Sequence, residues 1–344
     1  MALTALTAAL LLGACGNSSS GSSPEASGSA DKNPNLGTLK VAFASTQVAP
    51  ANFVQIAIGE GFYKKLGLDV EIKVLNSPQA AQALIAKQID IAHAASPGIN
   101  AALQGAPLKA IYTGTPLGPY WIVANPEIKS YDDLAGKVVG VYSTTGTLVG
   151  DTTKVLKTHG VDAAARKVSF SAAGGYNDQA ELAAIASGAY NAAVVSAIGV
   201  IQAEQKGLTV LGDFGDLPTM DWSIWTTDSV LKGRSAAVDA FLQGTIEGAR
   251  VYVDNPSRAL PYVAAGLSTD GKPDAASSRT AEQVMAKLTP ILTPDGVPEP
   301  GQWSDAVDRR RAAIPDSKKS ATDIADWTFA QKAAKAIDDQ GFKP

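Results

Sequence analysis

The stretch GEGFYKKLGLDVEIKVLNSPQAAQALIAKQIDIAHAAS, residues 59–96, contains the pattern that decides the fold of this chain. Apolar side chains at helical spacing end at Gly67, and glycine stops helices because it takes the left-handed backbone conformation cheaply. Residues 68–75 alternate between apolar and polar side chains, which is typical of a half-buried strand. Ser77-Pro78 predicts a helix start with serine as the cap, and residues 89–95 are typical of a short buried parallel strand. This order predicts an α/β protein with a mostly parallel sheet.

The order of elements in residues 84–105 recurs in residues 185–207. Both stretches contain a helix, a turn, a short apolar strand, a serine and a second helix, which predicts two lobes built from βαβ units. The two serines, Ser96 and Ser196, come directly after the predicted strands. Because ligands of open α/β sheets bind beyond the carboxyl ends of the strands, we expect both serines to cap helices that point at a ligand-binding cleft.

Residues 1–37 lack the pattern of a folded domain. The start of the chain is apolar, and the tetrapeptide Leu-Gly-Ala-Cys at positions 12–15 resembles a bacterial lipobox. We therefore interpret residues 1–15 as a lipoprotein signal peptide whose cysteine, Cys15, is lipidated and anchors the protein to the cell membrane. Residues 16–37 are rich in serine, glycine and asparagine, which predicts a flexible tether.

The composition excludes several classes of protein. The chain has 344 residues, 45% of them hydrophobic, which is enough for two lobes with substantial cores. A net charge of −4 without a basic cluster argues against a nucleic-acid partner. The single cysteine excludes a disulfide within the chain, and no zinc-ligand spacing occurs. We place the first part of lobe 1 at residues 38–122, lobe 2 at 123–221, and the return crossing with C-terminal helices, packed on lobe 1, at 222–344.

The segments GEGFYKKLGLDVEIKVL (59–75) and KQIDIAHAAS (87–96) also carry a family resemblance. Over residues 39–253, the chain resembles the solute-binding proteins of ABC transporters of the nitrate/sulfonate/taurine type, a group that includes thiamine-pyrimidine-precursor binders related to the THI5/NMT1 proteins. The resemblance implies a two-lobed periplasmic-binding-protein-like (type II) fold with two inter-lobe crossings. It also implies an extracytoplasmic monomer without cofactor, a small-molecule ligand, and an ABC permease and ATPase as partners. Lys87 stands where the family usually has glycine, and we expect only a less sharp turn there.

Polar residues at the predicted carboxyl ends of the strands are candidate ligand contacts. Residues 45–47 follow the first predicted strand, although serine and threonine are equally typical of a turn. The Ser/Thr/Gly segment 143–147 precedes a predicted helix, where free N–H groups, hydroxyls and the helix dipole can bind an anionic oxygen. The polar candidates are Ser45, Thr46, Gln47, Ser96, Ser143, Thr144, Thr145, Gly146, Thr147, Asn177 and Ser196.

Aromatic side chains lie at or near both predicted crossings between the lobes. They could stack on a flat ligand or belong to the core, and the sequence leaves both interpretations open. One carboxylate, that of Asp221, lies among them and could hold an amine. The candidates of this kind are Tyr120, Trp121, Tyr176, Asp221, Trp222 and Trp225.

The candidate segments contain no lysine or arginine. A multiply charged anion normally requires such a cation, whereas helix starts and hydroxyls can hold a monoanion such as a sulfonate or nitrate. We therefore expect a site without a cation and a small organic ligand of the sulfonate, nitrate or taurine type. A thiamine-precursor pyrimidine or another aromatic heterocycle is the alternative ligand.

No catalytic arrangement is recognisable in the sequence. His93 lies in an apolar predicted strand and His159 at a helix end, and neither belongs to a nucleophile–base pattern. The pyrimidine synthases related to this family depend on a cysteine-rich motif, which this chain lacks. We expect a binding protein without a metal site rather than an enzyme, and a two-lobed periplasmic-type enzyme or sensor domain is the third hypothesis.

Overall fold

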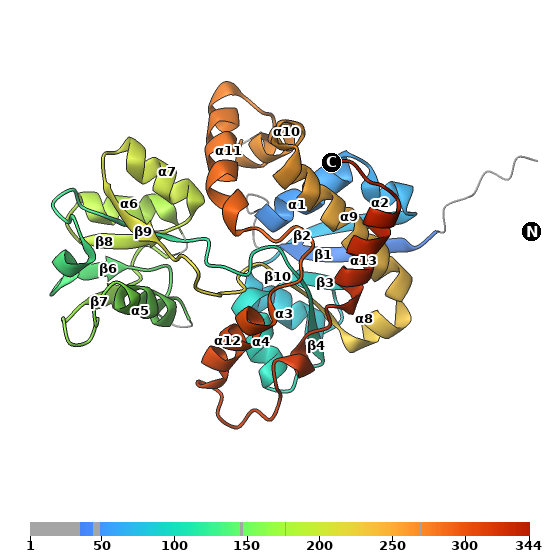
Figure 1. Cartoon of the computed structure of the whole chain (residues 1–344), viewed down its shortest axis with the longest axis horizontal. Coiled ribbons are helices and arrows are strands. Elements are labelled where there is room, and N and C mark those ends of the chain that lie inside the picture. Colours follow the sequence, from blue (N-terminus) through green and yellow to red (C-terminus); the bar gives the residue numbers. More distant parts are fainter. Residues whose placement is uncertain (1–34, 44–48, 145–146, 176, 269) are drawn as a thin grey trace, which may run out of the picture. The chain divides into compact units, whose positions relative to one another are not determined.

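The computed structural model describes residues 35–43, 49–144, 147–175, 177–268 and 270–344 (Figure 1). The chain divides into two units, residues 1–33 and 34–344, and the second unit contains all the elements described below. Gly37, which the sequence placed in the tether, is already the first residue of β1. The predictions for seven residues fall outside the described part of the chain and stay predictions: Cys15, Ser45, Thr46, Gln47, Thr145, Gly146 and Tyr176.

The first of two five-stranded sheets has the strand order β2-β1-β3-β10-β4. Strand β1 pairs in parallel with β2 and β3, whereas β10 is antiparallel to both β3 and β4. The strand predicted for residues 68–75 is confirmed by β2, although Val74 at its end is exposed, and β3 is shorter than the predicted 89–95. The strands are β1 (Gly37–Phe43), β2 (Leu68–Val74), β3 (Ile91–His93), β4 (Leu108–Thr113) and β10 (Ser223–Thr227).

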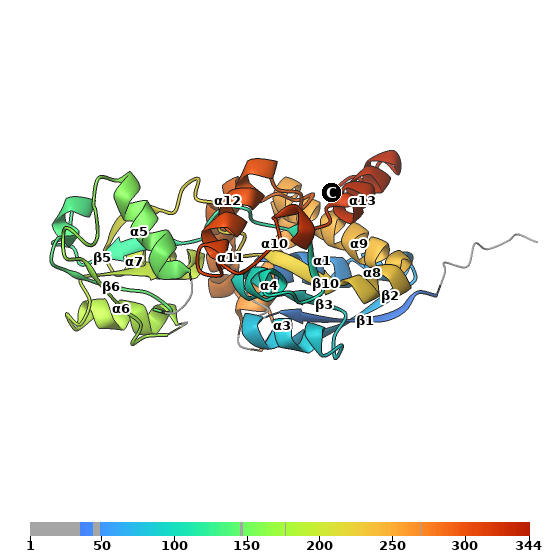
Figure 2. The ribbon, with the colours of Figure 1, turned by 90° about the horizontal axis from the view of Figure 1, so that it is seen from below.

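Helices cover both faces of the first sheet. Side chains of β1 alternate, so Leu39, Val41 and Phe43 pack in one cluster with α1 and α9, and Ala42 packs in another with α3 and α4. Figure 2 shows α3 and α9 on opposite faces of this sheet. The helices concerned are α1 (Ala49–Gly59), α2 (Phe62–Lys65), α3 (Ser77–Ile85), α4 (Ala95–Leu103) and α9 (Ser235–Asp254).

The second sheet has the order β7-β6-β8-β5-β9, in which β6 is parallel to β7 and β8, and β5 is antiparallel to β8 and β9. Apolar side chains of α5 cover one face, and those of α6 and α7 cover the other. The strands are β5 (Trp121–Ala124), β6 (Val138–Gly140), β7 (Ser169–Ser171), β8 (Ala192–Val195) and β9 (Thr209–Asp213). The helices are η1 (Tyr131–Leu134), α5 (Leu148–Thr158), α6 (Asp178–Ala186) and α7 (Ala197–Gln205).

Two segments, residues 114–120 and 214–222, connect the sheets, because β4 and β10 belong to the first and β5 and β9 to the second. The segments pair through an isolated antiparallel bridge between Leu117 and Pro218. The chain therefore passes between the sheets twice, and the two passages lie side by side. The residue bounds that we gave for the lobes remain a prediction.

The repeated sequence pattern is built in the same way in both sheets. Before β3, the carboxylate of Asp90 accepts a hydrogen bond from the Lys40 N–H of β1 (2.8 Å). Before β8, the amide oxygen of Asn191 accepts one from the Val138 N–H of β6 (3.1 Å). Each of these polar side chains ties the start of its strand to the neighbouring parallel strand.

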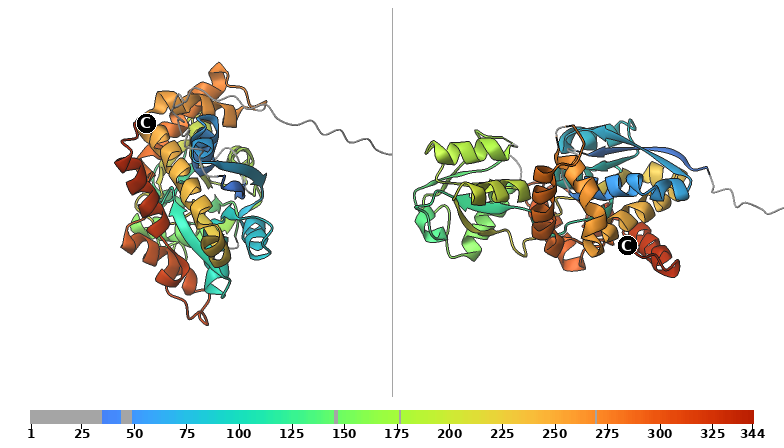
Figure 3. Two further views of the ribbon diagram at one scale, coloured as in Figure 1. Left: turned by 90° about the vertical axis from the view of Figure 1, so that its right-hand side faces the viewer. Right: turned by 90° about the horizontal axis from the view of Figure 1, so that it is seen from above.

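The C-terminal helices pack mainly on elements of the first sheet. Helix α13 lies against α9, as both views of Figure 3 show, and α12 contacts α4. Helix α11 contacts α7 instead, which covers the second sheet. None of the helices among the described residues is long and apolar enough to cross a bilayer. The remaining helices are α8 (Asp228–Gly233), α10 (Pro256–Leu267), α11 (Ala275–Leu288), η2 (Thr289–Ile291), α12 (Pro300–Arg311), η3 (Thr322–Ile324) and α13 (Thr328–Asp339).

Three local predictions were wrong. Asn76, not Ser77, caps α3, because its side chain accepts the Gln79 N–H (3.0 Å). Helix α4 begins at Ala95 without a side-chain cap, so Ser96 does not cap it. Lys87 has φ +57°, in the left-handed region that glycine favours, so the turn is as sharp as one with glycine.

Candidate ligand-binding site

The guanidinium of Arg310, on α12, lies among the polar residues that the sequence analysis singled out. Arg310 is 2% exposed. Its Nη2 donates to the Ser96 Oγ (2.5 Å), the Thr147 Oγ1 (3.2 Å) and the Thr219 carbonyl (3.2 Å). Nη1 donates to the Ala306 carbonyl (3.2 Å) within α12. One buried cation therefore joins the start of α4, the start of α5 and a connecting segment between the sheets.

This arrangement contradicts the expectation of a site without a cation. The candidate segments themselves contain no basic residue, but α12 brings one to them from far along the chain. Sequence reasoning missed Arg310 because it lies in the middle of a run of three arginines, Arg309 to Arg311, in the last turn of a helix. Basic residues are favoured there by the helix dipole, so the run is typical of a solvated helix end.

Two carboxylates accompany the guanidinium. Asp151, in the first turn of α5, is 5% exposed and forms an ion pair with the Arg309 Nε (3.5 Å). Burial raises the pKa of Asp151, and the charges of Arg310 and Arg309 act in the opposite direction. Burial also raises the pKa of Asp221 to about 6, although the Arg310 charge lowers it. Burial lowers the pKa of Arg310, and both carboxylates oppose this change. Arg309 also pairs with Asp305 on its own helix, and Asp305 pairs with Lys154, so three basic and three acidic side chains balance here.

One hydrogen-bond donor of Arg310, the Nε, is not used by the described residues. Its Nε is buried and has no hydrogen-bond partner among the described residues. A buried guanidinium normally uses its donors, because an unpaired buried polar group is unfavourable. The free Nε, next to the engaged Nη2, is therefore an available donor for an oxygen of a ligand.

Tyr120 and His93 border this cluster. The ring of Tyr120 is partly exposed and lies edge-on to Tyr142, at 6.1 Å between centroids, and its hydroxyl is hydrogen-bonded to Asp221. The Nε2 of His93 lies 2.7 Å from the Asp221 carbonyl oxygen, so this nitrogen is the donor. Burial lowers the pKa of His93 to about 4. A neutral His93 thus fixes the backbone at Asp221 and leaves the Asp221 carboxylate to the cluster.

The tryptophans lie mostly in the core. Trp225 is 0% exposed and packs on Trp303, at 6.0 Å between ring centroids. A Cβ on Gly98 would lie 2.6 Å from its indole, so the ring fills its space completely. Stacking of Trp225 on a ligand is therefore excluded in this structure. Trp121 and Trp222 each keep 8% of their surface exposed.

The second sheet presents a separate polar cluster. Ser196 caps α7, as predicted, by accepting N–H groups of the first turn of that helix. Its hydroxyl donates to the Asp178 carboxylate (2.5 Å), which also accepts the Tyr142 hydroxyl. Asn177 caps α6 and is exposed. These side chains connect residues that follow β6 and β8 in the second sheet, and among the described residues no hydrogen bond or ion pair joins Asn177 or Ser196 to Arg310.

The structure therefore brings together only part of the predicted set. Arg310 links Ser96 and Thr147 directly, and Asp221 and Tyr120 lie beside it. Ser143 is partly buried near the start of α5, and Thr144 is exposed. His159, at the end of α5, stacks on Tyr131 at 4.0 Å between centroids and belongs to no site.

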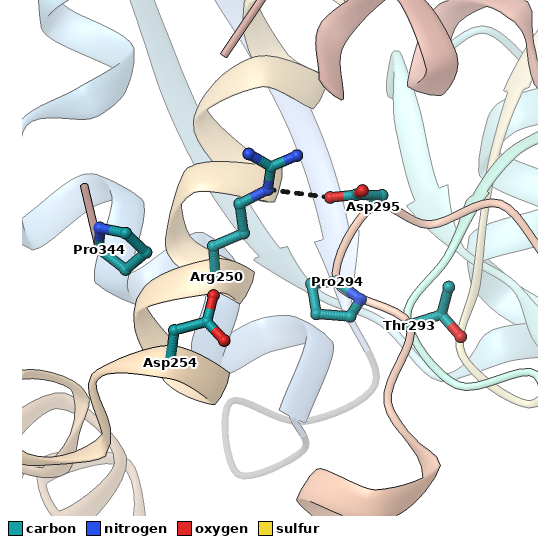
Figure 4. A pocket seen from close by; sticks show the side chains of 6 residues that line it. All are labelled: Arg250, Asp254, Thr293, Pro294, Asp295 and Pro344. Carbon is teal, nitrogen blue, oxygen red and sulfur yellow. Dashed lines mark hydrogen bonds and ion pairs between the residues drawn. The ribbon is translucent and has the colours of Figure 1, made fainter. Parts of the chain in front are cut away.

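A cavity of about 350 Å³ lies elsewhere, between α9 and the segment before α12 (Figure 4). Its cation, Arg250, donates to Asp295 (2.9 Å) and Asp338 (2.6 Å). Because both carboxylates neutralise this arginine, the cavity is a weaker candidate than the Arg310 cluster. The described residues contain no group of three or more histidine, cysteine and acidic side chains that could hold a metal ion.

Solved structures with the same fold include several binding proteins. The putative periplasmic sulfonate-binding protein SsuA of Methylobacillus flagellatus KT superposes with a TM-score of 0.68 at 15% identity, over 90% of this chain and 97% of that one. The aliphatic sulphonate binding protein SsuA of Escherichia coli gives 0.62 at 16% identity, over 84% and 90%. The nitrate-binding protein NrtA of Synechocystis PCC 6803 gives 0.61 at 16% identity, over 87% and 89%. At these identities the likeness shows the fold.

Family membership follows from the sequence itself. No curated protein matches the chain. Residues 51–259, more than half of the chain, match the family described as NMT1/THI5 like, and the fold is the two-sheet α/β fold of the periplasmic binding proteins above. The chain belongs to the NMT1/THI5-like family.

Proposed function

We propose that this protein is an extracytoplasmic solute-binding lipoprotein that captures a small organic anion and delivers it to an ABC importer. The observation that carries the proposal is the buried Arg310 guanidinium, held by Ser96 and Thr147 from helices of the two sheets. The family and the fold support a binding role, and the relatives named above bind sulfonates and nitrate. The importer supplies a permease and an ATPase, and Cys15 carries the lipid anchor.

The charge balance of the cluster limits the ligand. With Lys154, Arg309 and Arg310 ionised on one side and Asp151, Asp221 and Asp305 on the other, the formal charges cancel. A multiply charged anion would leave excess negative charge in a buried place, which is strongly unfavourable. A sulfonate-like monoanion on the Nε and Nη2 of Arg310 adds a single charge, and an amine on the same ligand would compensate that charge at Asp221. A taurine-like amino sulfonate provides both groups, the sulfonate for Arg310 and the amine for Asp221.

The test is calorimetric titration of the full chain with methanesulfonate, taurine and nitrate. We expect one of them to bind, and Arg310→Gln to weaken that binding. Truncating one member of a buried charge pair typically costs about 2–5 kcal/mol, which corresponds to a loss of roughly 30-fold or more in affinity. The matched control is Arg311→Gln, because Arg311 pairs with Asp308 on the surface. Equal affinities of the two variants for the ligand would contradict the proposal.

A second candidate ligand is a flat nitrogen heterocycle, such as an aminopyrimidine. It is favoured by the partly exposed Tyr120 ring beside Asp221, whose pKa of about 6 suits an exchange of a proton with a weak base. Titration with 4-amino-5-hydroxymethyl-2-methylpyrimidine discriminates the two. Asp221→Asn should abolish binding of the heterocycle, whereas it removes a negative charge beside Arg310 and so should strengthen rather than weaken methanesulfonate binding.

Lipidation is tested separately. Metabolic labelling of a bacterial host with a palmitate analogue should label the wild-type protein and leave Cys15→Ser unlabelled. Labelling of the variant, or no labelling of the wild type, would contradict the proposed anchor.

A further inference from the structure

Helices α5 and α12 meet along a row of polar side chains. On α5 the residues are spaced by three and four positions, so they share one face of the helix. Their partners follow in reverse order on α12, which makes the contact antiparallel. The pairs are Thr147 with Arg310 (3.2 Å), Asp151 with Arg309 (3.5 Å) and Lys154 with Asp305 (3.5 Å). We call this row the α5–α12 contact.

The two helices belong to different sheets. Helix α5 covers a face of the second sheet, whereas α12 packs on α4, which covers the first. The Arg309 side chain also donates to the Pro218 carbonyl in a segment that connects the sheets. The α5–α12 contact therefore fastens an element of one sheet to an element of the other, close to the two connections.

The three pairs differ in burial, and burial decides how much each pair stabilises the α5–α12 contact. Lys154 and Asp305 expose 47% and 43% of their side chains, and such pairs contribute little. Asp151 exposes 6% of its side chain and Arg309 exposes 21%. Losing one partner of a pair buried to this degree leaves a charge that water cannot reach well. Arg309 also pairs with Asp305 of its own helix. Of the two ion pairs between the helices, the Asp151–Arg309 pair is the more buried one, and salt screens it less than the outer pair.

We propose that the α5–α12 contact is a link between the two sheets that holds them together in the ligand-free protein. Its innermost pair is formed by Arg310, so a ligand that binds this guanidinium acts on the same contact. Movement of α5 away from α12 must break the Asp151–Arg309 pair. The strength of that pair then limits how readily the Arg310 cluster opens.

Spin-label distance measurements on the full ligand-free chain test this directly. Labels are placed at Gln79→Cys on α3 and Lys157→Cys on α5, both exposed positions, in a Cys15→Ser background. We expect Asp151→Asn and Arg309→Gln each to shift the distance distribution away from that of the parent. The double variant should shift it no further than the larger single effect, because both remove the same pair.

The controls are Asp308→Asn and Arg311→Gln, which make the same charge changes on the outer face of α12, where the two residues pair with each other. They should leave the distribution unchanged. If circular dichroism shows that Asp151→Asn does not fold, the test rests on Arg309→Gln, which should fold because the Arg309 side chain is partly exposed. Distributions of a folded Arg309→Gln variant that coincide with the parent would overturn the proposal, whatever ligand the protein binds.

Discussion

Replacing Arg310 by methionine should destabilise the protein in a pH-dependent way. The guanidinium is 2% exposed and donates to four acceptors, so its loss leaves Asp151 and Asp221 without their common cation. The charge of Arg310 offsets those of two buried carboxylates, and removing such a charge costs about 3–5 kcal/mol, the range for breaking a buried ion pair. In a unit of this size 1 kcal/mol corresponds to about 2 °C in Tm, so we expect a loss of about 6 °C or more at neutral pH.

The dependence on pH follows from the two carboxyl groups. The Arg310 charge lowers the pKa of both Asp151 and Asp221, so in Arg310→Met both values rise further above those of the unfolded chain. A carboxyl group whose pKa is raised on folding favours the folded state at low pH, and this stability is lost as the pH rises through the folded pKa. The loss of the four hydrogen bonds does not depend on pH, so the deficit in Tm should be present at pH 5 and larger at pH 8.

The assay is thermal unfolding by circular dichroism at both pH values, compared with Arg311→Met. Arg311 forms a partly exposed pair with Asp308, so its removal should change Tm by no more than a degree or two. A deficit of Arg310→Met that equals that of Arg311→Met, or that does not grow between pH 5 and pH 8, would refute the reasoning.

Three further predictions concern positions outside the cluster. Glu181 is 0% exposed, neither carboxylate oxygen has a partner among the described residues, and burial raises its pKa to about 7. Glu181→Gln should therefore gain stability relative to the wild type as the pH rises from 5 to 8 in urea unfolding, and a parallel pH profile would contradict this. Gly98→Ala should lower the free energy of unfolding by about 1–3 kcal/mol in the same assay, because its Cβ would lie 2.6 Å from the Trp225 indole. An unchanged midpoint would show that the indole ring can move aside. Lys87→Gly should raise the unfolding midpoint, since φ is +57° there and glycine relieves a strain of about 1 kcal/mol; a lower midpoint would mean that the lysine side chain contributes more than the strain.

Much of the fold could be predicted because its signals are local. Alternation in β2 and the glycine at position 67, which has φ +74°, both follow from the nearest neighbours in the chain. The helix starts were less predictable, because Asn76 and Ser77 are both good caps and the choice between them depends on the backbone of the preceding turn. At Lys87 the glycine usual in the family indicated a left-handed residue, but a lysine in its place suggested a less sharp turn, and the structure keeps the left-handed conformation.

The site was predictable only where it follows from the topology of the sheets. Ser96 and Thr147 lie at Arg310 because each follows a strand at its carboxyl end, a rule that needs no distant residue. Arg310 itself could not be assigned, since its contacts depend on how α12 packs on α4. Trp225 could not be told from a stacking residue, because large aromatic side chains look the same in a core strand and at a crossing.

The position of the ligand tests the account most directly. A crystal structure of the protein with the best-binding sulfonate should place a sulfonate oxygen about 2.7–3.0 Å from the Arg310 guanidinium, with the Nε as one of its donors. A ligand bound at Arg250, or elsewhere without contact to Arg310, would contradict the central claim.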